Sequence, residues 1–202
     1  ADAEVLDVDE DAYRRNTLST TVYGIAATPA LPGLRQASKW ASDASSEARA
    51  QEGIARFIVE IMRPDTLYLL GAGSTTAAVT ALLGLEGTLL GVDAVHGGRM
   101  VGRDLNEDGI SALLDRYPAV KIIVSPIGAQ GFVLGRGNQQ ISPEVIRRAG
   151  PENLIVIATP AKISRTPSLY LDTGDTALNA AFGTSVAVIT GYAMAERIPL
   201  KT

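Results

Sequence analysis

The chain has 202 residues, of which 46% are hydrophobic and 20% are charged, and its formal net charge is −4. This composition is typical of a globular protein and gives no overall electrostatic attraction to nucleic acid. There is no cysteine and a single histidine, which excludes disulfides, cysteine-based zinc sites and histidine-rich metal centres.

The sequence shows neither a membrane span nor a targeting signal. No run approaches the roughly 18 to 20 apolar residues that a spanning helix needs. The first stretch, ADAEVLDVDEDAYRR, is acidic, whereas signal and transit peptides are basic. We therefore expect a cytoplasmic protein that binds neither membranes nor nucleic acid.

Residues 1–46 are expected to hold a first strand, within residues 19–31, and a polar serine- and alanine-rich connection. From Glu47 the pattern becomes helical, and Pro64 marks its end. One apolar stripe runs along this helix at three- and four-residue spacing and predicts a core face: Ile54, Phe57, Ile58 and Ile61. We expect residues 47–202 to form one α/β domain.

Beyond this helix, short apolar runs alternate with helical patterns. Strands are predicted within 65–71, 87–95, 119–127, 153–160, 168–175, 184–192 and 194–201, and helices within 74–84, 106–118, 142–150 and 175–183. Gly97 and Gly98 predict a hairpin turn. Asn106 and Ser142, the latter followed by Pro143, are expected to cap their helices. The pattern predicts an α/β fold: an open, mostly parallel sheet covered by helices, with a short antiparallel hairpin section.

The stretch LYLLGAGSTTAAV, residues 67–79, is the first candidate site. A strand runs into Gly71 and Gly73, which let the backbone approach a ligand, and Ser74, Thr75 and Thr76 open a helix. Free N–H groups at a helix start favour a phosphate. The stretch matches neither G-x-x-x-x-G-K-[ST] nor a full G-x-G-x-x-G. A tight turn with a serine cap remains the alternative.

The stretch GAQGFVLGRGNQQISPEVIRR, residues 128–148, is the second candidate. Its glycines, including Gly135 and Gly137, allow tightly folded backbone, and Arg136 offers a planar fork to a phosphate or carboxylate. The amides that follow can bind a ribose or a base: Asn138, Gln139 and Gln140. A polar surface loop without a ligand is the alternative.

Three further groups of residues are weaker candidates. Asp93 and Asp104 flank the predicted hairpin and could bind Mg²⁺, or could be solvated turn residues. Thr159, with Lys162 nearby, could meet a phosphate at a strand end. Asp175 is expected to cap the next helix.

Read in order, TLYLLGAGSTTAAV, TLLGVDAV, GRDLNE, GRGNQQISPEVI, IVIATPAK and LYLDTGD resemble the C-terminal part of the ATP-NAD kinase family, the AcoX-like branch of the NAD kinase superfamily. The resemblance covers about residues 5–188. It implies phosphorylation of the adenosine ribose 2′-hydroxyl of NAD, with ATP or polyphosphate as donor and Mg²⁺ as metal. It also implies that the nucleotide contacts come from the first and second candidate stretches.

The sequence departs from the family in one respect. Such kinases carry a glycine-rich GGDGT loop in an N-terminal domain, where its aspartate is the expected catalytic base, and no such motif stands in these 202 residues. We therefore expect the second domain alone, inactive by itself, with the kinase domain supplied by the same or another chain. Whether the chain forms a homo-oligomer is left open.

Two other functions remain open at this point. The GAGST turn is also similar, over short segments, to the phosphate loops of ribose-5-phosphate isomerase and glucosamine-phosphate deaminase relatives. The chain could therefore be a sugar-phosphate-binding sensor without catalysis. It could also be a phosphosugar isomerase, for which Asp93 is the candidate base.

Overall fold

The computed structural model describes the backbone of residues 2–8, 20–27, 41–127 and 131–202, and the side chains of 45–127 and 131–202. Its first element is a hairpin of β1 (Asp2–Val8) and β2 (Thr20–Ala27). β2 confirms the central part of the predicted first strand, whose remaining residues, 19 and 28–31, lie outside the described part. No pattern in the sequence predicted β1.

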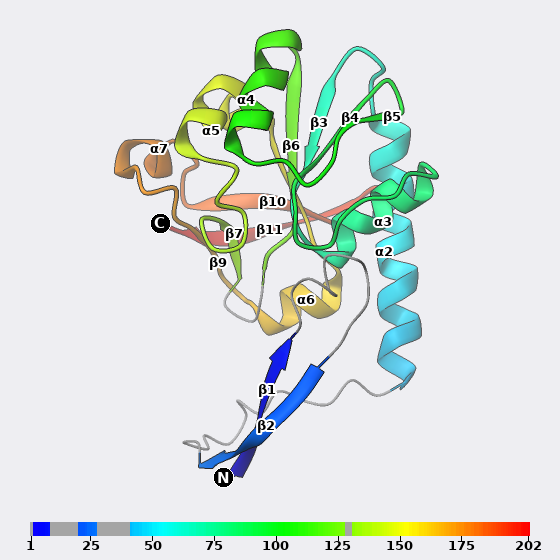
Figure 1. Ribbon diagram of the computed structural model, residues 1–202, viewed down its shortest axis with the longest axis vertical. Coiled ribbons are helices and arrows are strands. Elements are labelled where there is room, and N and C mark those ends of the chain that lie inside the picture. The colour runs from blue at the N-terminus through cyan, green and yellow to red at the C-terminus, as the bar shows by residue number, and fades with distance from the viewer. Residues whose placement is uncertain (1, 9–19, 28–40, 128–130) are drawn as a thin grey trace.

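A nine-stranded sheet forms the body of the molecule (Figure 1). Its strands are β3 (Leu67–Leu70), β4 (Asp93–His96), β5 (Arg99–Gly102), β6 (Val120–Val124), β7 (Phe132–Leu134), β8 (Leu154–Ile157), β9 (Leu169–Leu171), β10 (Ser185–Gly191) and β11 (Met194–Lys201). The spatial order is β5-β4-β3-β6-β8-β10-β11-β9-β7. Neighbours are parallel except at β5–β4, β4–β3 and β10–β11, which confirms the predicted α/β fold.

The helices are α2 (Ala41–Ile61), α3 (Ser74–Leu82), α4 (Glu107–Arg116), α5 (Pro143–Ala149), α6 (Pro160–Arg165) and α7 (Thr176–Ala181), with a short 3₁₀ turn at Pro151–Asn153. The predicted caps are confirmed: Asn106 accepts the Gly109 N–H, and Ser142 accepts the Val145 N–H. Across the described ranges, no helix combines the length and apolar character that crossing a membrane requires.

Three sequence predictions need correction. α2 begins at Ala41 rather than Glu47, so residues 41–46 are helical instead of a connection; their alanines and exposed serines extend a helix anchored further along by its apolar stripe. The strand predicted within 87–95 begins only at Asp93. The polar stretch after Gly131 contains β7, because Phe132 and Leu134 pair with β9.

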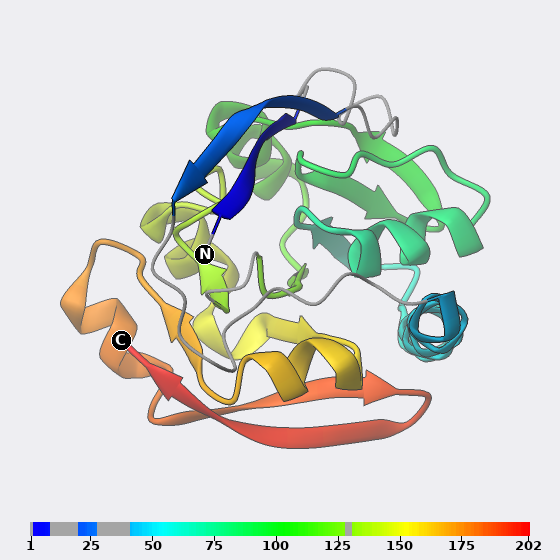
Figure 2. The same ribbon diagram turned by 90° about the horizontal axis from the view of Figure 1, so that it is seen from below.

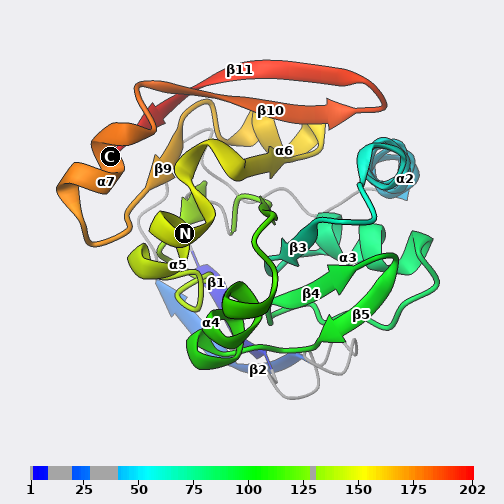
Figure 3. The same ribbon diagram turned by 90° about the horizontal axis from the view of Figure 1, so that it is seen from above.

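Alternating side chains along the central strands build two cores. Leu67 and Leu69 of β3 belong to one cluster, together with residues of α4, α5 and the far strands, whereas Tyr68 and Leu70 pack with α2 and α3 on the other face. Both faces are buried, which is why these strands read as continuous apolar runs. Figure 3 shows the sheet curving around α5, with α2 and α3 outside the curve.

The hairpin at Gly97–Gly98 joins β4 to β5 as predicted. Both glycines have positive φ, 57° and 73°, which is the backbone geometry that a two-residue hairpin turn requires. The antiparallel section therefore lies at one edge of the sheet and leaves the parallel strands β3, β6 and β8 at its centre.

The packing of α2 gives the first prediction. Ile58 is fully buried between α2 and β3 as predicted. Ile61 was predicted to share the core face, but it is the last residue of α2 and is 43% exposed. Ile58→Ala should lower the free energy of unfolding by about 2–5 kcal/mol, because it leaves a cavity under the helix. The matched control Ile61→Ala should change it by less than about 1 kcal/mol. Urea denaturation of both variants measures this, and equal losses would contradict the described orientation of α2.

Candidate functional site

The loop that joins β3 to α3 presents unpaired backbone donors. Gly73 has φ 131°, a conformation that residues with a side chain rarely adopt, and no side chain caps the helix. Ser74 is thus the first helical residue and not the cap. Among the described residues, the N–H groups of Ser74, Thr75 and Thr76 find no acceptor. A nine-residue helix with free first-turn N–H groups favours an anion at this end.

The first turns of α2 add polar side chains to the same edge of the sheet. Gln51 donates from Nε2 to Ser74 Oγ at 3.0 Å. The hydroxyl of Thr159, two residues after the end of β8, donates to Glu47 Oε1 at 2.9 Å. Figure 2 looks onto this edge from below, with α3 beside α2 and α6 nearer to β10. No local pattern predicts that Glu47 and Gln51 lie at this edge, since they precede the loop by twenty residues or more.

Lys162 of α6 completes this edge beside the end of β6. Its Nζ donates to Ser125 Oγ at 3.2 Å and to the Pro126 carbonyl at 3.0 Å. Ser125 is itself fully buried and lies next to Gly73, where an added Cβ would be 3.7 Å from the Ser125 Cβ. The carboxyl ends of β3, β6 and β8 therefore carry neighbouring polar side chains and a lysine, at the place where open α/β sheets bind ligands.

The second stretch forms a cavity of about 300 Å³ against the turn after β9. Gly135, with φ 95°, lies so close to this turn that a Cβ would be 2.3 Å from the Asp172 carbonyl oxygen. The cavity is lined by Gly135, Arg136, Gln139, Ile141, Ser142, Pro143, Asp172, Thr173 and Gly174. Gly135 therefore allows two loops to approach each other closely, in addition to adopting the positive φ of a turn.

Asn138 connects the two candidate stretches. Its side chain is completely buried, its Oδ1 accepts the Ala72 N–H at 3.1 Å, and its Nδ2 donates to the Val133 carbonyl at 3.2 Å. A Cβ on Gly71 would lie 2.8 Å from Asn138 Oδ1, so this glycine is needed for the contact. The two loops, 66 residues apart in sequence, are thus hydrogen-bonded neighbours.

The residues predicted to contact a ligand lie in three kinds of place: at the start of α3, in the cavity wall, and packed inside the protein. Gly71, Gly73, Ser74, Thr75 and Thr76 stand together at the start of α3, and Gly135, Arg136 and Gln139 line the cavity. Asn138 lies between the two groups instead of on a surface. Gly137 packs against Ile127, and Gln140 is half buried. Two side-chain oxygens of these predicted residues, Thr75 Oγ1 and Gln140 Oε1, are buried without a partner among the described residues.

Asp93 is a buried structural acceptor in this fold. Its carboxylate accepts the Thr88 N–H at 2.6 Å, the Thr88 hydroxyl at 3.1 Å and the Asp104 N–H at 3.0 Å. These bonds tie the segment before β4 to the one after β5. Within the described ranges no three acidic or histidine side chains gather as metal ligands. Of the two aspartates predicted to bind Mg²⁺, Asp93 therefore already accepts three hydrogen bonds within the protein.

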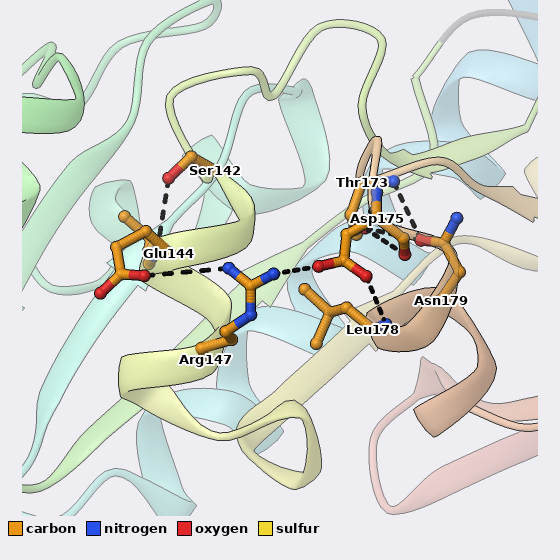
Figure 4. A network of polar contacts seen from close by, with 8 residues as sticks. Ser142, Glu144, Arg147, Thr173, Asp175, Leu178 and Asn179 are labelled. Carbon is orange, nitrogen blue, oxygen red and sulfur yellow. Dashed lines mark hydrogen bonds and ion pairs between the residues drawn. The ribbon is translucent and has the colours of Figure 1, made fainter.

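A polar network holds the outer wall of the cavity (Figure 4). Asp175 caps α7 by accepting the Leu178 N–H at 3.0 Å, as predicted, and it also pairs with Arg147 of α5. The Leu178 N–H and then the Arg147 guanidinium hold the pKa of Asp175 below its ordinary value. Thr173 in the cavity wall bonds to Asn179 of α7. The network therefore fixes the Asp172–Gly174 turn relative to α5.

Residues 64–200 match the family model described as the ATP-NAD kinase C-terminal domain. No curated protein and no solved structure matches the chain. The matched range begins just before β3 and ends within β11, so it contains both loops, the cavity and Asn138.

The cap at Asp175 predicts a pH-dependent contribution to stability. Because the folded-state pKa is lowered, the contribution is present above the ordinary aspartate pKa of 3.8 and is lost as the pH falls through the folded-state value. Asp175→Ala should lower the melting temperature at pH 7, and the difference from wild type should shrink toward the acid end of the range, at pH 2. A difference that persists unchanged at that pH would contradict this role. Thermal unfolding followed by circular dichroism from pH 7 to pH 2 measures it.

Proposed function

Because the chain belongs to the ATP-NAD kinase C-terminal domain family, we propose that it binds a nicotinamide dinucleotide across the two loops that Asn138 joins. The observation that carries the proposal is the pair of hydrogen bonds from Asn138 to Ala72 and Val133. They hold the loop before α3 against the loop whose Gln139 lines the cavity. This arrangement would suit a ligand that has both phosphates and ribose groups.

The phosphates belong, in this proposal, at the start of α3. The N–H groups of Ser74, Thr75 and Thr76 would donate to phosphate oxygens, and the helix dipole would favour the negative charge. Lys162, at the same edge, adds a positive charge near the end of β6. The backbone at Gly73 leaves no Cβ in the way of the ligand.

The ribose and base belong in the cavity of the second loop. The amide of Gln139 is exposed at the cavity and can both donate and accept hydrogen bonds to ribose hydroxyls. Arg136 lines the same cavity and brings a guanidinium to it. We assign to these groups the orientation of the dinucleotide, whose adenosine 2′-hydroxyl is the proposed phosphoryl acceptor.

Phosphoryl transfer itself needs donor phosphates positioned in line with the acceptor and groups that stabilise the transition state. The GGDGT loop that the family uses for this is not among these 202 residues. We therefore propose that these residues bind nucleotide, with transfer from ATP or polyphosphate requiring a GGDGT-bearing segment in the same or another chain. No step is assigned to Mg²⁺ at Asp93 and Asp104, because the oxygens of Asp93 are already hydrogen-bonded.

The test is calorimetric titration of the 202-residue chain with NAD, NADP, ATP and ribose 5-phosphate. We expect binding of NAD or NADP that is tighter than that of ribose 5-phosphate. Gln139→Ala should weaken it about tenfold, the scale of one good hydrogen bond of roughly 1.4 kcal/mol. Glu86→Ala, which removes a side chain of equal length from an exposed loop, is the matched control and should leave affinity unchanged.

Two results would contradict the proposal. One is the absence of heat with all three nucleotides. The other is tight binding of ribose 5-phosphate together with indifference to dinucleotides, which would favour a sugar-phosphate sensor. Transfer of phosphate to NAD by the 202 residues alone would refute the proposed need for a GGDGT segment.

A further inference from the structure

Three side chains form a row across the last strands of the sheet, and one of them, Phe132, comes from the second candidate stretch. Lys201 of β11 pairs in register with Tyr170 of β9, and Tyr170 pairs with Phe132 of β7. The residues just before Tyr170 and Lys201 on these strands, Leu169 and Leu200, are buried in the core. Because successive side chains on a strand point to opposite faces, the row of Lys201, Tyr170 and Phe132 stands on the outer face of the sheet.

The row combines aromatic rings with a cation at close range. The ring centroids of Phe132 and Tyr170 are 5.4 Å apart, and Lys201 Nζ lies 5.5 Å from the Tyr170 centroid. The strand order places Tyr170 between the other two side chains. The Cζ atom of Arg136 lies 5.1 Å from the centroid of the Phe132 ring. Tyr170 is nonetheless 36% exposed, so the row is accessible to a ligand.

A cavity of about 430 Å³ opens onto this row, within the size range of small-molecule sites. Its other walls come from the segment after α6 and include Arg165, Pro167 and Ser168. The Arg165 side chain forms no hydrogen bond or ion pair with any described residue, and none of the described residues that line the cavity is a carboxylate. In a chain of net charge −4, a cavity whose described lining has two cations and no acid has a local potential that favours an anion.

We propose that this cavity binds a phosphomonoester that carries a flat ring system, such as a nucleoside monophosphate. A phosphomonoester has a charge of about −1.5 to −2 at pH 7, which matches the two lining cations, and the Arg165 guanidinium can bond two of its oxygens at once. The ring system would contact Phe132, Tyr170 and Pro167, since aromatic side chains bind planar bases without sequence preference.

This cavity is separate from the proposed dinucleotide site. It lies where β7 and β9 begin, beside Phe132 and Ser168, whereas the other cavity lies where the same strands end, beside Gly135 and Asp172. The inference does not rest on the proposed function, and either can fail without the other.

The test is a titration with AMP followed by backbone amide NMR, with adenosine and inorganic phosphate as comparison ligands. AMP should shift the amide signals of Ser168, Tyr170 and Lys201. Affinity at these signals should fall about tenfold or more in Arg165→Gln and in Lys201→Gln, because each removes a charged hydrogen-bond donor to phosphate. Arg99→Gln, an exposed arginine on β5 at the other end of the sheet, should bind as wild type.

Adenosine and inorganic phosphate should each bind these residues more weakly than AMP. The proposal is overturned if AMP leaves the three amide signals unchanged, or if Arg165→Gln and Lys201→Gln bind like wild type. It is also overturned if inorganic phosphate binds as tightly as AMP, since the ring contacts would then contribute nothing. Shifts confined to Gly73–Thr76 would remove this second site and leave the proposed function standing.

Discussion

The arrangement of the candidate site depends on one buried amide. Asn138 is fully enclosed, and an amide buried without partners would cost several kcal/mol. Its two hydrogen bonds remove that cost only when the Gly71–Gly73 loop and the chain around Val133 stand at the observed separation. The close approach at Gly71 leaves no room for a Cβ. The contact therefore fixes two loops from distant parts of the sequence as one surface.

Around this contact, the central parallel strands supply the platform. β3, β6 and β8 end at the same edge, so Gly73, Ser125 and Thr159 meet there although their positions in the sequence are far apart. The helices α2 and α6 bring Gln51 and Lys162 to the same edge. The strands hold the loops in place, and the loops present the groups that can bind a ligand, as is usual in α/β proteins.

Much of the fold could be predicted from the sequence, because strands buried on both faces read as apolar runs and the caps at Asn106, Ser142 and Asp175 are local signals. The start of α2, the short strand β7 and the hairpin partner β1 could not, since tertiary pairing decides them. For the site, the glycines and helix start at residues 71–76 were readable from local pattern. The inward direction of Asn138 and the contribution of Glu47 were not, because both depend on contacts between distant segments.

The central claim is that the two loops joined by Asn138 act as one binding site, and an amide-resolved NMR titration with NADP tests it most directly. The account predicts that the signals of Gly73–Thr76 and of Gly135–Gln140 shift together along a single binding curve. It also predicts that Asn138→Leu, which keeps the branching and the number of side-chain heavy atoms but removes both hydrogen bonds, separates or abolishes the two responses. Shifts in only one loop, or two responses with different affinities in the wild-type chain, would contradict it.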